Sequence, residues 1–90
     1  MKRVLHVCHT QEAARQKFYE FIKQTHADSI AERIVVSQLL VEFPHVRHQF
    51  VSIHGIEEWL RGMEYSSIIV DEAVSLTDEQ ASFLRSRERI

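Results

Sequence analysis

The stretch VLHVC at residues 4–8, followed closely by Thr10, decides the fold of this chain. A short run of β-branched and other apolar residues is typical of a buried strand. Threonine favours the position just before a helix, because its hydroxyl accepts a hydrogen bond from a backbone N–H of the first turn. From there to Thr25, the following apolar residues recur at the spacing of one helix face: Ala14, Phe18, Phe21 and Ile22. The segment predicts a strand that leads into a helix.

Later segments repeat this alternation. QFVSI at residues 49–53 and SSIIV at residues 66–70 have the composition of strands, and residues 56–61 fit one or two helical turns between them. Strands that alternate with helices pair in parallel through crossover connections. We therefore expect a single α/β domain over residues 1–90, with a small three-stranded parallel sheet flanked by helices.

Residues 29–43 allow two interpretations. Ser29 and Glu32 have the spacing of a capping box, and Pro44 is expected to end the helix that they would begin. The interior, IVVSQLLV at residues 34–41, is apolar on nearly every side, which suits either a deeply buried helix or a strand. The capping box favours the helix, and the strand remains the alternative.

The end of the chain has a clearer helix signal. Thr77 and Gln80 form a second capping box, in which each side chain satisfies a backbone N–H of the other residue. Phe83 and Leu84 then lie on the face that we expect to point inward.

Composition narrows the functional class. The 90 residues carry a formal net charge of −2, with acids and bases interleaved, so no basic surface for duplex nucleic acid or an anionic membrane is indicated. The single cysteine excludes an internal disulfide and a thiolate zinc cage, and it suits the reducing cytoplasm, where we expect the protein. We expect neither a signal peptide nor a membrane span.

The most informative motif is IIVDEA at residues 68–73, an apolar strand that ends in Asp71 and Glu72. The longer stretch LRGMEYSSIIVDEA at residues 60–73 resembles the Walker B region of helicase-like ATPases and of phage terminase large subunits. The resemblance implies a reduced core like that of P-loop NTPases, of phage or mobile-element origin. It also implies that the first acid would hold magnesium and the second would orient the attacking water.

The phosphate-binding half of such a core has no counterpart in the chain. The sequence contains no G-x-x-x-x-G-K-S/T, and its only glycines are Gly55 and Gly62. Backbone amides cannot form a phosphate cradle without glycines at the turn. We therefore expect no nucleotide cofactor and no nucleotide hydrolysis. The acidic pair can also arise without a function, because short acidic residues commonly end strands in α/β domains.

Cys8 and Arg15 resemble the phosphate-binding motif of low-molecular-weight phosphotyrosine phosphatases. That family requires C-x5-R, whereas six residues separate the two here and no glycine lies between them. An inert, buried cysteine is the favoured interpretation. Among the histidines, we expect His6 to be a hydrogen-bonded core residue, and we expect three others at the surface: His26, His45 and His48.

The ends of the three expected strands form a second candidate site. They carry His9 and Thr10, His54, and the pair Asp71 and Glu72. If all three strands are parallel, these residues lie along one edge of the sheet, where open α/β sheets bind ligands. Two imidazoles and a carboxylate could hold a transition metal. We expect instead a polar docking surface with at most weak metal affinity, and we assign no metal.

Three functions remain open from the sequence. The favoured one is a small, non-catalytic accessory or binding protein that docks on a protein partner. The first alternative is a fragment or subunit of a helicase- or terminase-type ATPase that supplies the acidic pair. The second is a small metal- or phosphoryl-dependent enzyme that uses the strand-end cluster. Nucleic acid is a possible partner that the charge does not indicate, and no membrane is expected.

Overall fold

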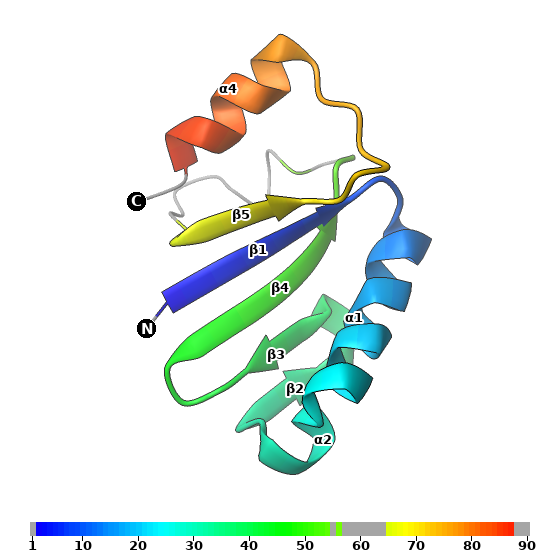
Figure 1. The fold of residues 1–90 in the computed structure, drawn as a ribbon, viewed down its shortest axis with the longest axis vertical. Helices are drawn as coiled ribbons and strands as arrows, with labels where there is room; N and C mark the ends of the chain where they lie inside the picture. Colours follow the sequence, from blue (N-terminus) through cyan, green and yellow to red (C-terminus); the bar gives the residue numbers. More distant parts are fainter. Residues whose placement is uncertain (1, 55, 57–64, 88–90) are drawn as a thin grey trace.

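The computed structural model describes residues 2–54, 56 and 65–87, and it shows an α/β fold (Figure 1). In chain order the elements are β1 (Lys2–Cys8), α1 (Gln11–Thr25), α2 (Ala27–Ile30), β2 (Arg33–Val35), the 3-10 helix η1 (Val36–Gln38), β3 (Leu40–Glu42), β4 (Val46–Ser52), β5 (Ser67–Val70) and α4 (Asp78–Arg87).

The strands form one mixed sheet in the order β2-β3-β4-β1-β5. β1 is parallel to both of its neighbours, β4 and β5, whereas β3 is antiparallel to β2 and to β4. The three expected strands are therefore present and parallel. The expectation of a three-stranded parallel sheet is nevertheless wrong, because β2 and β3 extend it to five strands with mixed directions.

The two added strands lie in the segment for which a helix was expected. Helix α2 ends at Ile30, before most of residues 29–43, so the expected helix is wrong and the strand alternative is right. The apolar run has β-branched residues that pair across β2 and β3, with Ile34 opposite Val41. Leu39 has a φ of 51°, in the left-handed region, which reverses the chain between the strands and excludes a continuous helix.

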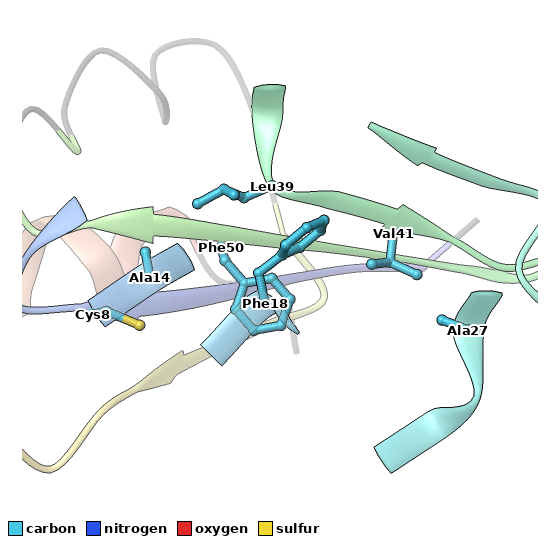
Figure 2. Packing of buried hydrophobic residues seen from close by; sticks show 7 residues of the cluster. All are labelled: Cys8, Ala14, Phe18, Ala27, Leu39, Val41 and Phe50. Atoms are coloured by element: carbon cyan, nitrogen blue, oxygen red, sulfur yellow. The ribbon is translucent and has the colours of Figure 1, made fainter. Parts of the chain in front are cut away.

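Helix α1 follows the predicted pattern. The Thr10 hydroxyl accepts a hydrogen bond from the Ala13 N–H at 3.0 Å, which confirms the predicted N-cap. Ala14 and Phe18 are fully buried against the sheet, and Figure 2 shows Phe18 beside Phe50 of β4. The apolar stripe read from the sequence is thus the face that docks the helix on the sheet.

Alternate residues of β1 divide the core between the two faces of the sheet. Cys8 packs with residues of α1 and β4, and one buried cluster contains Cys8, Ala14, Phe18, Ala27, Leu39, Val41 and Phe50 (Figure 2). Leu5 and Val7 pack on the opposite face with Leu84 of α4; that cluster contains Leu5, Val7, Val51, Ile56, Tyr65 and Leu84. We call these two sides the α1 face and the α4 face.

The predicted capping box of α4 is present. The Gln80 N–H donates to the Thr77 hydroxyl and the Thr77 N–H donates to the Gln80 side-chain oxygen, each at 3.1 Å. Leu84 is buried and Phe83 packs at the margin of the core, as expected. Apart from Ile56, the helical turns expected at residues 56–61 lie outside the described residues. Within the described part of the chain, no helix has the length and apolar character needed to cross a bilayer.

Candidate functional site: a pocket at the ends of β1 and β5

A pocket of about 400 Å³ opens on the α1 face, where β1 and β5 end. Its lining combines apolar and titratable side chains: His6, Val7, Cys8, Lys17, Phe50, Ile69, Val70, Asp71 and Glu72. The sheet register explains part of the floor, because His6 of β1 is paired with Phe50 of β4 on one side and with Ile69 of β5 on the other. Ile69 is 50% exposed, so this row runs from the buried core to solvent.

The acidic pair lies at the mouth of this pocket. The Asp71 N–H donates to the Val7 carbonyl at 2.9 Å, which extends the parallel pairing of β5 with β1 by one residue. The Asp71 carboxylate accepts a long hydrogen bond of 3.4 Å from the Ala73 N–H, and Glu72 is exposed. The strand therefore delivers both carboxylates to the pocket, and neither is committed to an ion pair in the described structure.

The remaining members of the predicted strand-end cluster have other surroundings. β1, β4 and β5 are parallel, so the residues that follow them do lie toward one edge of the sheet. His9, Thr10 and His54 are exposed and do not line the pocket, and the Thr10 hydroxyl is occupied as the cap of α1. Across residues 2–54, 56 and 65–87, no group of three or more histidine, cysteine or acidic side chains is placed to hold a metal ion.

His6, which lines the pocket, is paired with His48 of β4, which lies beside the pocket and outside its lining. The Nε2 atom of His6 and the Nδ1 atom of His48 are 3.0 Å apart, so one ring donates a hydrogen bond to the other. His6 also stacks on Phe50, with the ring centroids 4.2 Å apart and the planes 9° from parallel. Phe21 of α1 packs against the other ring, with its centroid 4.6 Å from that of His48. The expected hydrogen bond of His6 is confirmed, and the ring is partly buried at the margin of the core.

These surroundings favour neutral imidazoles. Burial, with a contribution from the neighbouring His48, lowers the pKa of His6 to about 4. Burial also lowers the pKa of His48. Both effects have the same cause, because a charged ring loses hydration when it is enclosed by aromatic side chains. At neutral pH the pair is uncharged.

Cys8 has the properties of a core thiol. It is 2% exposed, and burial raises the pKa of its thiol; the nearby Asp71 carboxylate adds to the rise and the Lys17 ammonium opposes it. A raised pKa keeps the sulfur protonated and a poor nucleophile. Arg15 lines a separate hollow on the outer side of α1 rather than this pocket. The inert interpretation of Cys8 therefore agrees with the structure, and the phosphatase-like motif is not assembled.

Sequence reasoning found the two carboxylates of the pocket and missed other polar groups in it and beside it. His48 was expected at the surface beside the turn after Pro44, which is wrong, because it is half-buried under Phe21. His26 and His45 are exposed, as expected. Lys17 is exposed at the helix surface, and nothing in its local sequence indicates that it borders a pocket. The alternation of β4, with His48 and Phe50 two residues apart, is the one signal that these residues share a face.

Comparison with known proteins adds no relative: no family model matches the chain, and neither a curated protein nor a solved structure matches it.

Proposed function

We propose that this protein is a small, non-catalytic binding module that docks a basic segment of a protein partner in the pocket at the ends of β1 and β5. The observation that carries the proposal is the placement of Asp71 and Glu72 at the mouth of a pocket whose floor includes the half-exposed Ile69. A carboxylate pair above an apolar floor complements a side chain with an apolar stem and a cationic end.

The charges of the lining favour such an occupant. Two carboxylates, those of Asp71 and Glu72, line the pocket with one ammonium, that of Lys17, and His6 is neutral at pH 7. The balance is one negative charge. An arginine fits this setting well, because its planar guanidinium donates to two carboxylate oxygens at once and stacks on aromatic rings.

We propose that the strand that resembles Walker B belongs to a degenerate NTPase core, because the sequence contains no P-loop motif for the phosphates. Only His9 and Thr10 connect β1 to α1, beside the strand that carries the acidic pair. A two-residue connection without glycine offers few backbone amides for a triphosphate. We propose that the acidic pair has a binding role in place of a catalytic one.

A short peptide tests the docking role directly. The probe is the tripeptide Leu-Arg-Leu, acetylated and amidated at its ends, titrated into the 15N-labelled protein at about pH 7. We expect a dissociation constant of about 1 mM, since one side chain supplies most of the contact. The amide shifts should concentrate in β1, β5 and the residues after β5.

Matched variants then assign the contact. The double variant Asp71→Asn and Glu72→Gln should weaken binding of Leu-Arg-Leu at least tenfold, whereas Lys17→Met should strengthen it, because that change removes the competing cation. The peptide Leu-Glu-Leu is the charge control and should not bind. Equal binding of the two peptides, or shifts that concentrate on the α4 face, would contradict the proposal.

The alternative of an ATPase subunit makes an opposite prediction with nucleotide. A nucleotide at 100 times its dissociation constant would stabilise the fold by about 2.7 kcal/mol, which is readily seen as a higher melting temperature. We expect no shift with magnesium-ATP or magnesium-GTP and no release of phosphate. A clear shift of the isolated chain would favour the ATPase alternative over the docking role.

A further inference from the structure

We propose that the His6–His48 pair is an acid-released latch, which holds α1 against the sheet at neutral pH and lets this face open as the pH falls. The pair is central to that face: it joins β1 to β4 by a side-chain hydrogen bond, and Phe21 of α1 packs on the rings of both histidines. This inference does not depend on what the pocket binds.

The hydrogen bond between the two rings makes the pair sensitive to protonation. With both rings neutral, one N–H donates to one lone pair across 3.0 Å. One added proton places a charge among Phe21, Phe43 and Phe50, whose rings surround the pair. A second proton removes the remaining lone pair, so two N–H donors face each other. When the face opens, water solvates both rings. This removes the cost of the buried charge and the cost of the two opposed N–H donors.

The charged groups around the pair do not compensate for its protonation. Lys17 of α1 borders the same pocket as His6 and would repel a charged ring, whereas Asp71 and Glu72 lie at the pocket mouth and would attract it. On the neighbouring strands, Glu42 and Arg47 form an ion pair at 2.9 Å and so satisfy each other. Burial is the main cause of the lowered pKa of both His6 and His48, so the enclosed pair favours its neutral form.

The sign and size of the response follow from linkage. An exposed histidine has a pKa of about 6.5, so the open state binds more protons than the closed state between that value and about 4, the value for His6. The closed state is favoured fully above this window and loses its advantage as the pH falls through it. For His6 alone, the opening equilibrium should increase on the order of 20-fold between pH 7 and pH 5.

Hydrogen exchange at single amides measures this opening. After correction for the intrinsic pH dependence of exchange, the amides of α1 should open on the order of 20-fold more often at pH 5 than at pH 7, while those of α4 should change much less. The double variant His6→Phe and His48→Phe keeps the aromatic packing and removes the titrating groups, so its α1 amides should lose the response. His45→Gln, a change at an exposed histidine, should retain it.

Two results would overturn the latch. One is an equal pH response in α1 and α4, which would indicate global acid destabilisation. The other is a response that persists in the double phenylalanine variant. If that variant does not fold, the imidazole signals of the wild-type protein decide. The latch requires that His6 and His48 titrate below the ordinary histidine pKa of about 6.5, and titration of both rings at that value would refute it.

Discussion

The two faces of the sheet are built from the same strands but respond to different chemistry. On the α4 face, β1 contributes Leu5 and Val7, both fully buried among apolar side chains. On the α1 face, the same strand contributes His6 and Cys8, and the face opens into a pocket with Lys17, Asp71 and Glu72 on its border. Alternation along β1 thus places aliphatic side chains on the α4 face and the titratable side chains of His6 and Cys8 on the α1 face.

This difference teaches where function can reside in so small a domain. A face of aliphatic residues contributes stability through the area it removes from water, and few of its members can respond to a proton or a ligand. A face with neutral, hydrogen-bonded histidines is stable only while they remain neutral. The pocket and the proposed latch both lie on the second face.

The largest expected effect measures how much the packing of α1 on the α1 face contributes to the free energy of unfolding. Phe18 is fully buried and meets Phe50 edge to face, with the ring centroids 6.0 Å apart. Phe18→Ala should lower the free energy of unfolding by about 3–5 kcal/mol in urea melts, because it leaves a cavity under the helix. Lys17→Ala, one residue away and exposed, is the control and should cost less than about 0.5 kcal/mol. Similar losses from both would mean that the phase of the helix is wrong.

A smaller effect compares the helices that cover the two faces. Thr10 caps α1 and Thr77 caps α4, and each hydroxyl accepts a hydrogen bond from the backbone N–H three residues further along the chain. Replacement of either by alanine should cost about 1 kcal/mol of unfolding free energy, as is usual for the loss of an N-cap. Thr→Ser at the same positions keeps the hydroxyl and is the matched control. A cost at one cap and none at the other would show that one helix contributes little to global stability.

Elements with a local sequence signal could be predicted, whereas elements that depend on distant pairing could not. β1, α1, β5 and α4 were predictable because each carries its own signal, such as the caps at Thr10 and Thr77 or a short apolar run. β2 and β3 were not, because the apolar residues from Ile34 to Val41 satisfy a buried helix and a strand equally, and only pairing with β4 decides between them.

The pocket and the histidine pair beside it also combine local with long-range information. Asp71 and Glu72 follow a strand directly, so their place at the strand end is local information. His6 and His48 are 42 residues apart and meet only through the parallel register of β1 and β4. Lys17 borders the pocket because α1 packs on this face of the sheet. These contacts arise from the tertiary structure, so they cannot be predicted from a short segment of the sequence.

The smallest expected effect concerns the acidic pair, and it separates a binding role from a structural one. The Asp71 carboxylate makes one long hydrogen bond of 3.4 Å and Glu72 is exposed, so neither contributes much to the folded state. Asp71→Asn and Glu72→Gln preserve shape and an acceptor oxygen, and each should change the free energy of unfolding by less than about 0.5 kcal/mol. For a domain of this size, that is a shift of roughly 2–4 °C at most in the melting temperature, measured by circular dichroism. A loss several times larger from either variant would make the pair part of the scaffold and weaken the case for docking. An unchanged melting temperature together with lost binding of the arginine peptide would place its role in recognition, on the same face as the histidine latch.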